Sequence, residues 1–246
     1  MMTRNHDQRP GISVFFPAFN DAGSIGPLVQ NAFETLPTLT ADYEVIVVND
    51  GSTDATRAVL EQLARVHAQL RIIEHPDNRG YGAALRSGFD HATKDLVVYT
   101  DGDGQYDVRQ LPALHAKLLP GVDVVNGFKV QRADSAHREV LGSVYNRLAR
   151  SLFRLPIRDV DCDFRLLRRS VLKRVKLSSS SGAICVELVR KLRSEGAVFA
   201  ETPVNHFPRI HGRSQFFTPR RIILTAFDFC VLWFRLVFIA ALISGN

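Results

Sequence analysis

The chain has 246 residues, of which 46% are hydrophobic and 23% are charged, so it can bury one large core or two small ones and is neither disordered nor of low complexity. The formal net charge of +6 is uneven, because residues 1–126 hold 10 Lys and Arg against 16 Asp and Glu, whereas residues 127–221 hold 20 against 8. This asymmetry favours an acidic half that binds a metal and a basic half that faces phosphates or a membrane surface, with a solvated basic surface as the alternative. Nucleic-acid binding is not expected, because the sequence has no zinc-finger spacing, RNP-type aromatic motif or basic-region heptads.

Cysteine usage and the first residues indicate the compartment. Cys162, Cys185 and Cys230 form no Cys-x-x-Cys pair, which predicts reduced and mostly buried thiols. Residues 1–10 are polar and lack the apolar core of a signal peptide. We therefore expect a flexible N-terminus and a globular part that stays on the cytosolic side.

Residues 11–126 alternate short apolar runs with helix-like stretches. The predicted strands cover 12–16, 45–48, 71–74, 96–100 and 122–126, and the predicted helices cover 24–36, 53–67, 82–92 and 108–118. This βαβ rhythm predicts an α/β fold with a mostly parallel sheet flanked by helices.

Polar motifs follow three of these strands where the strands end. They are Pro17-Ala18-Phe19-Asn20, Asn49-Asp50-Gly51-Ser52 and Asp101-Gly102-Asp103-Gly104-Gln105. Ligands of such sheets bind beyond the carboxyl ends of the strands, so we expect the three motifs on one rim. A dinucleotide dehydrogenase and a P-loop NTPase are disfavoured, because neither Gly-x-Gly-x-x-Gly after the first strand nor a Walker-type Gly-Lys-Ser/Thr is present.

The run from Asp101 to Gln105 has the outline of a divalent-metal site. Residues i and i+2 of an extended chain project to the same side, so the carboxylates of Asp101 and Asp103 converge and Gly102 leaves room for a ligand. Two carboxylates and the amide oxygen of Gln105 suit Mg²⁺ or Mn²⁺. An ordinary turn is the alternative interpretation of this run.

The alternation ends after residue 126. A helix is predicted at 139–153 and an acidic cluster follows at 159–165. A serine run at 178–181 indicates a mobile loop, and a second helix is predicted at 183–195.

Residues 222–243 are the most apolar stretch, in which only Thr225, Asp228 and Arg235 are clearly polar. The opposing insertion energies of its apolar and charged residues make a lone membrane span marginal. Asp228 and Arg235 fall near one helical face, so an interfacial helix with a wet face is also open. Arginines just before the stretch place that end at the cytoplasmic, anionic leaflet. The alternative is a buried amphipathic helix of a soluble domain.

Several motifs occur in a fixed order along the chain. They are Pro17–Asp21, Val47–Asp54, Asn78–Gly82, Asp101–Gln105, Asp161–Arg165 and His211–Gln215. As a set they resemble the family 2 glycosyltransferases of the GT-A fold, and they are most similar to the dolichol- or polyprenyl-phosphate hexose synthases, over about residues 10–218. The resemblance implies a GT-A domain at 11–218, with a nucleotide-sugar half at 11–126 and an acceptor half at 127–218. A membrane-associated or transmembrane helix would follow at 219–246.

The resemblance also implies roles for individual residues. The nucleotide-sugar donor would be bound by Pro17, Phe19, Asn20, Asp21, Asp50, Arg79, Gly80, Asp101, Gly102 and His211. Asp101, Asp103 and Gln105 would hold Mg²⁺ or Mn²⁺ on the diphosphate, and Asp103, Arg165 and Arg213 would act in catalysis. Asp50 would contact the base or ribose, and Arg165 would face the donor sugar or the acceptor phosphate. His211 and Arg213, with Arg209, would close over the phosphates.

The implied reaction is an inverting transfer of one hexose from GDP-mannose or a UDP-hexose to polyprenyl or dolichyl phosphate. The enzyme would sit at the cytoplasmic face of the inner membrane, peripherally or through a single span, and could have a membrane protein partner. Negative charge builds on the departing diphosphate, so a metal ion and arginines would stabilise the transition state. The ionised acceptor phosphate needs positioning by cations more than a base, and the candidates are Arg132, Arg138, Arg147 and Arg158.

Alternatives remain for several of these interpretations. Helix capping would also explain Asp50, and a hydroxyl acceptor would instead need a carboxylate base, for which Asp161 or Asp163 could serve. A non-catalytic membrane scaffold that keeps the fold is a third hypothesis. The sole tryptophan, Trp233, lies in no Gln-x-x-Arg-Trp element, so single-sugar transfer is favoured over processive synthesis. Asp161-Cys162-Asp163-Phe164 stands where this branch often has Thr-Ser-Gly-Phe, which leaves donor and acceptor preference open.

Overall fold

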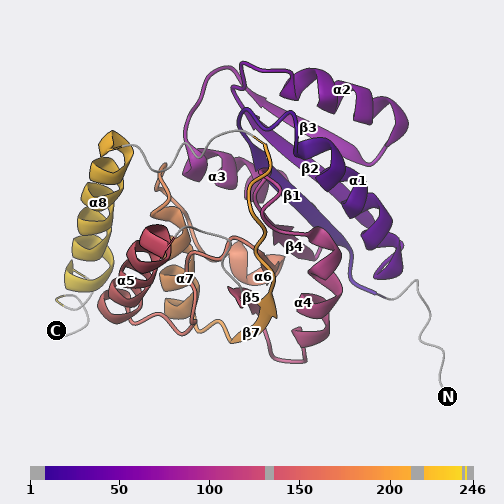
Figure 1. The fold of residues 1–246 in the computed structure, drawn as a ribbon. Helices are drawn as coiled ribbons and strands as arrows, with labels where there is room; N and C mark the ends of the chain where they lie inside the picture. The colour runs from indigo at the N-terminus through magenta and orange to yellow at the C-terminus, as the bar shows by residue number, and fades with distance from the viewer. Residues whose placement is uncertain (1–8, 131–135, 212–218, 240–241, 243–246) are drawn as a thin grey trace.

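The computed structural model describes residues 9–130, 136–211, 219–239 and 242, and within them seven strands form one sheet (Figure 1). The strands are β1 (Ile12–Ala18), β2 (Tyr43–Asp50), β3 (Leu70–His75), β4 (Leu96–Tyr99), β5 (Val124–Lys129), β6 (Arg165–Arg168) and β7 (Phe199–Val204). Their order is β3-β2-β1-β4-β6-β5-β7, with β6 antiparallel to both neighbours and the other pairs parallel. The predicted mostly parallel sheet and its first five strands are confirmed, whereas β6 and β7 were not predicted.

Helices cover both faces of this sheet. They are α1 (Ile25–Thr35), η2 (Leu36–Thr38), α2 (Thr56–Val66), α3 (Tyr81–His91), η3 (Val108–Gln110), α4 (Leu111–Lys117), α5 (Ala136–Phe153), α6 (Arg169–Leu172), α7 (Ile184–Ser194), α8 (Pro219–Trp233) and the π-helical η4 (Phe234–Ile239). One core lies between the sheet and α1, α2 and α4, and the other lies between the sheet and α3, α5, α7 and α8. The result is a three-layer α/β arrangement, as the alternation of segments predicts.

Strand β1 shows why the central strands read as continuous apolar runs. Val14 and Phe16 belong to the core beside α1, whereas Phe15 belongs to the core beside α3. Successive side chains of a strand point to opposite faces, and here both faces are covered. Every residue of β1 is therefore buried.

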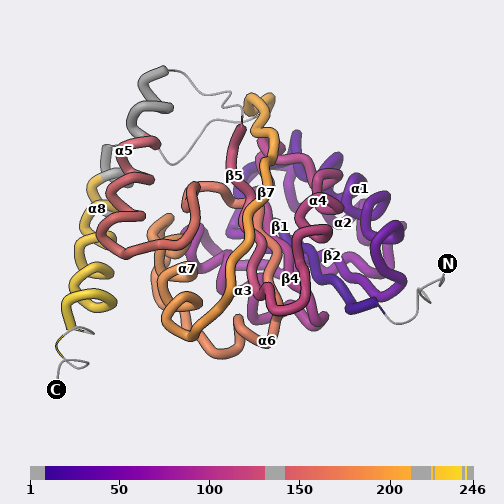
Figure 2. Tube along the Cα trace, turned by 90° about the horizontal axis from the view of Figure 1, so that it is seen from below, coloured from indigo at the N-terminus to yellow at the C-terminus, as the bar shows by residue number. Residues whose placement is uncertain are grey.

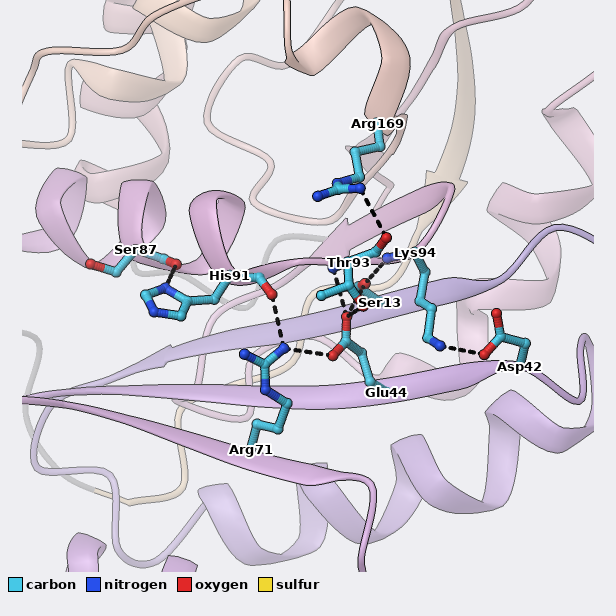
Figure 3. Close-up of polar contacts among 9 residues, drawn as sticks. All are labelled: Ser13, Asp42, Glu44, Arg71, Ser87, His91, Thr93, Lys94 and Arg169. Carbon is cyan, nitrogen blue, oxygen red and sulfur yellow. Dashed lines mark hydrogen bonds and ion pairs between the residues drawn. The ribbon is translucent and has the colours of Figure 1, made fainter.

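A buried carboxylate joins the amino ends of β1, β2 and β3, at the rim opposite the polar motifs (Figure 3). Glu44 accepts hydrogen bonds from the Ser13 hydroxyl at 2.7 Å, from the Thr93 backbone N–H and hydroxyl, each at 2.7 Å, and from Arg71 at 2.9 Å. Burial alone would raise the pKa of Glu44, but these donors outweigh it and lower the pKa to about 2.

The C-terminal helix packs against the body of the protein. Figures 1 and 2 both show α8 beside α5, and the Phe229 ring lies 5.6 Å from Tyr145 and 5.0 Å from Phe153 of α5. From α7, Arg190 donates to the Leu236 carbonyl of η4 at 3.4 Å. Among the described residues, no helix combines the length and apolar character that a membrane crossing requires. The transmembrane form of the helix expected at 219–246 is therefore not seen in them.

The Glu44→Gln substitution is expected to lower the free energy of unfolding by about 1–3 kcal/mol, because the amide loses the charge that Arg71 and the other donors stabilise. Since the pKa of folded Glu44 lies below its usual 4.5, this contribution is present above about pH 4.5 and is lost as the pH falls toward 2. Urea denaturation should therefore show a difference between the free energies of unfolding of wild type and Glu44→Gln near pH 7, and this difference should narrow on acidification.

The exposed Glu61, which is paired with Arg57 on α2, supplies the control for this measurement. Glu61→Gln should change the free energy of unfolding by less than about 0.5 kcal/mol. Equal losses in the two variants would contradict the role given to Glu44.

Candidate active site

The loops after β1 and β2 are hydrogen-bonded to one another at the carboxyl-end rim. Asn20, in the left-handed region with a φ of 57°, accepts from the Thr53 backbone N–H at 2.8 Å and donates its own N–H to the Ser52 hydroxyl at 3.0 Å. The N–H of Asp21 donates to the Thr56 hydroxyl at 3.0 Å. The two motifs thus share one rim, and the Asn20 side chain holds the two loops together.

Asp50, at the end of β2, shapes the loop that follows β3. Its carboxylate lies 2.5 Å from Nδ1 of His75 and accepts the backbone N–H groups of Arg79 and Gly80, each at 3.0 Å. Nε2 of His75 lies 2.8 Å from the Ser87 hydroxyl. Both carboxylate oxygens are thus engaged within the protein, and the base or ribose contact expected for Asp50 stays a prediction.

The motif after β4 packs tightly against the end of β1. Gly102 donates its N–H to the Pro17 carbonyl at 3.1 Å, and the Ser24 hydroxyl donates to the Gly102 carbonyl at 2.8 Å. A Cβ at position 102 would lie 2.6 Å from the Pro17 oxygen. The approach of the two loops therefore requires glycine at this position.

Acidic side chains gather around the same motif. Asp101 accepts from the Tyr81 hydroxyl at 2.8 Å, and Asp103 forms an ion pair with Arg209. Burial raises the pKa of Asp101 well above its usual range, and the carboxylates of Asp163 and Asp103 raise it further. Burial also raises the pKa of Asp21, which lies beside Asp103, to about 6.

This donor set fits a divalent cation, because hard carboxylate oxygens that repel one another are stabilised by Mg²⁺ or Mn²⁺. Among the described residues, no group of three or more His, Cys, Asp or Glu side chains is arranged to hold an ion. Asp101 and Asp103 would therefore need oxygens from phosphates and water to complete the coordination.

The chain returns to this site after β7, over residues 205–211. The N–H of Phe207 donates to the Gln105 carbonyl at 2.8 Å, and the Gln105 amide nitrogen donates to the Phe207 carbonyl at 3.2 Å. The side chain of Gln105 thus holds the returning segment through its amide nitrogen, and the metal-ligand role expected for its amide oxygen stays a prediction. The segment brings Arg209 to Asp103. It also lays the His211 ring over Gly23, where an added Cβ would lie 2.6 Å from the ring.

Arg165 differs most from its expected position. It begins β6, is fully buried, and donates to the Tyr99 hydroxyl, to the Asn126 side-chain oxygen and to the carbonyls of Val160 and Cys162. These contacts enclose its guanidinium, which has no exposed surface. We infer a structural role from them, and the catalytic role expected for Arg165 stays a prediction.

The structure does not bring the expected acceptor-phosphate residues together as it does the residues expected to bind the donor. Arg147 is exposed on α5. Arg158 is exposed, pairs with Glu201 at 3.4 Å and lies 4.8 Å from the Phe128 ring centre. Arg132 and Arg213 lie outside the described residues, and Arg138 belongs to α5 without a described side chain.

Sequence reasoning missed polar groups that come from α3 and α7. Tyr81 contacts Asp101, and the Cys185 thiol donates to Asp163 at 3.0 Å. Tyr81 lies within the quoted Asn78–Gly82 motif, so that motif was its available signal. Nothing in the sequence marks Cys185, because the contact depends on how α7 packs.

The serine run is held rather than mobile. The buried Glu187 of α7 accepts the backbone N–H groups of Ser178 and Ser179 at 3.0 and 2.8 Å. The Ser180 carbonyl accepts the N–H of Gly82 at 2.8 Å. The run therefore fixes the start of α3, which carries Tyr81, contrary to the mobile loop predicted for it.

Comparisons with known proteins agree with this geometry. The sequence profile of the family described as "Glycosyl transferase family 2" matches residues 13–176. Dodecaprenyl-phosphate galacturonate synthase of Rhizobium johnstonii is 30% identical over 218 residues, which are 87% of this chain and 64% of that protein. The chain thus spans less than two thirds of the length of this relative.

Solved structures resemble the fold. The mannosyltransferase PcManGT from Pyrobaculum calidifontis, in complex with GDP-Man and Mn²⁺, has a TM-score of 0.67 at 24% identity, covering 95% of this chain and 65% of that one. Glucosyl-3-phosphoglycerate synthase from Mycobacterium tuberculosis, in complex with Mn²⁺, UDP-Glc and phosphoglyceric acid, has a TM-score of 0.68 at 16% identity, covering 92% of this chain and 79% of that one. The expected GT-A fold is confirmed.

Replacing Arg165 by Lys should lower the free energy of unfolding by about 2–4 kcal/mol, because a lysine cannot reproduce the forked donors and leaves buried acceptors unpaired. Chemical denaturation measures the loss, and Arg174→Lys at an exposed site is the matched control. A stable Arg165→Lys protein that has lost activity would restore the catalytic role first expected for Arg165.

Proposed function

Because this chain belongs to glycosyl transferase family 2, we propose that it transfers one sugar, with inversion, from a nucleotide diphosphate sugar to polyprenyl phosphate at the cytoplasmic face of a membrane. The observation that carries the proposal is the Asp101 and Asp103 pair after β4, to which the segment after β7 brings Arg209. The same segment places His211 at Gly23, in the loop after β1. The printed name of the Rhizobium johnstonii relative supports a polyprenyl-phosphate acceptor. The candidate donors are GDP-mannose, a UDP-hexose and a nucleotide-linked galacturonate.

The donor half of the site would act through charge. Asp101 and Asp103 would hold Mg²⁺ or Mn²⁺, which supplies positive charge to the departing diphosphate. Arg209 already lies at Asp103, so it is placed to donate to a diphosphate bound there. Negative charge on the diphosphate grows as the glycosidic bond breaks, so these donors stabilise the transition state more than the ground state.

The acceptor half would position an anion. A phosphate monoester is largely ionised near neutral pH, so it attacks without a general base and needs orientation by cations. The exposed guanidinium of Arg147 on α5 is a described candidate, and Arg132, Arg138 and Arg158 remain proposals from the basic half of the sequence.

One observation favours a second acceptor class. The carboxylate of Asp163, held by the Cys185 thiol at 3.0 Å, lies close enough to Asp101 to raise its pKa. A carboxylate beside the reacting centre is the group that a hydroxyl acceptor would require as base. The product separates the two classes, because mild acid cleaves a sugar phosphodiester of a polyprenol, whereas most ordinary glycosides survive.

The direct test incubates the full chain with radiolabelled nucleotide sugars, polyprenyl phosphate and Mn²⁺ or Mg²⁺. We expect an acid-labile, lipid-linked product from one donor class, and its loss when a chelator removes the metal. The proposal fails if no donor yields a metal-dependent lipid-linked product.

Asp103→Ala should lower turnover at least about 100-fold, because it removes a predicted metal ligand and the partner of Arg209. The thermal unfolding midpoint should fall, since the buried carboxylate also accepts the Gln105 N–H at 3.0 Å, so circular dichroism at the assay temperature should confirm that the variant is folded. Asp90→Asn, at an exposed position of α3, is the control and should retain full turnover. Undiminished cellular function of Asp103→Ala would favour the non-catalytic scaffold.

A further inference from the structure

Two helices at one side of the protein expose continuous apolar stripes. On α5 the stripe consists of Val144, Leu148 and Leu152, spaced four residues apart. On α8 and η4 it consists of Ile223, Phe227, Val231, Phe234 and Phe238, spaced three or four residues apart. Residues at this spacing share one helical face, so each stripe is an unbroken ridge. Ile223 and Phe227 are 68% and 65% exposed, which is unusual for large apolar side chains that are neighbours on one helical face.

The opposite face of the same helix is already occupied. Leu232 is buried, and Phe229 packs between Tyr145 and Phe153 of α5. Arg190 of α7 reaches the Leu236 carbonyl of η4. The stripe on α8 and η4 therefore faces outward because the inner face is docked, and Figures 1 and 2 both show α5 and α8 side by side, away from α1 and α2. We call the two stripes together the α5–α8 face.

The charges around the α5–α8 face are almost all positive. Arg147 and Arg150 of α5, Arg154 just after it, and Arg235 of η4 are exposed. Among the side chains described on α5, α8 and η4, Asp228 is the only acid, and it is half-buried. An apolar ridge flanked by arginines matches a surface with an apolar interior and anionic head groups.

We propose that the α5–α8 face lies on an anionic lipid bilayer, with its apolar ridges inserted among the acyl chains and its arginines among the head groups. Charge complementarity selects this occupant over a second copy of the chain, since two copies meeting at this face would oppose arginines to arginines. The inference deepens the proposed function and rests on it for the acceptor, because a bilayer at this face would present a lipid-linked acceptor beside Arg147.

Vesicle flotation of the full chain tests the proposal without any donor or turnover. Wild type should float with vesicles of phosphatidylcholine containing roughly 30% phosphatidylglycerol and bind far less to phosphatidylcholine alone. Raising NaCl several-fold should weaken the binding, because it screens the arginines. The double variant Phe227→Ser/Phe234→Ser should lose at least about tenfold in partitioning, since it removes two large inserting side chains.

Matched variants keep the test sharp. Val144→Ser/Leu148→Ser on α5 should show a similar loss, which guards against a folding defect confined to α8. Val66→Ser/Leu119→Ser changes two apolar residues that are 73% and 59% exposed elsewhere on the protein, and it should float like wild type. Circular dichroism should show the same helix content for all three double variants.

Three results would overturn the inference. In the first, the α5 and α8 double variants both float with vesicles as well as wild type does. In the second, Val66→Ser/Leu119→Ser loses as much vesicle binding as they do. In the third, wild type does not float but forms concentration-dependent dimers, and Phe227→Ser/Phe234→Ser abolishes these dimers. Failure of the proposed reaction can be told apart from failure of the docking face. Flotation with no lipid-linked product would leave the docking face standing, whereas transfer to a water-soluble short-chain prenyl phosphate without flotation would remove the docking face alone.

Discussion

One buried guanidinium joins the two halves of the sheet. Arg165, at the start of β6, donates to Tyr99 of β4 on one side and to Asn126 of β5 on the other, and its remaining donors reach the carbonyls of Val160 and Cys162. A fully buried cation is costly unless its donors find acceptors, so this position fixes both neighbouring strands and the loop before β6. Tyr99 is two residues from Asp101. The geometry of the acidic motif therefore depends on a side chain that does not itself face a ligand.

The rim combines repelling carboxylates with cations delivered from distant segments. Asp101, Asp103 and Asp163 are close enough for their charges to interact, and Arg209 is the cation that the structure places among them. Such a site has a strong preference for bound positive charge, which suits chemistry in which a diphosphate departs with its counter-ion. The polar groups behind the rim, among them His75, Asp50 and Glu187, hold the surrounding loops in place.

Much of the fold followed from hydrophobic periodicity, because β1, β2 and β4 are apolar runs that are almost entirely buried and the helices between the strands have polar faces. The position of the three polar motifs on one rim followed from their places after the carboxyl ends of predicted parallel strands. Strand β6 was not predictable in this way, because Arg165-Leu-Leu-Arg168 is short and bounded by charge, and the burial of Arg165 is set by partners far away in sequence. The contacts of Asp50, Gln105 and the serine run could not be predicted for the same reason. Their side chains or backbones are engaged by groups that become neighbours only in the folded chain.

The insertion of β6 between β4 and β5 has a consequence for how the protein is made. Until residues 165–168 leave the ribosome, β4 has a neighbour on one side only, and its other edge presents unpaired N–H and C=O groups. The contact that covers this edge of β4 joins residues about seventy positions apart, so it forms late and at high loop-closure cost. A nascent chain ending near residue 126 thus carries β1 to β4 with an open edge on β4 that the finished sheet covers. Premature termination or stalling in this interval would expose a template for aggregation.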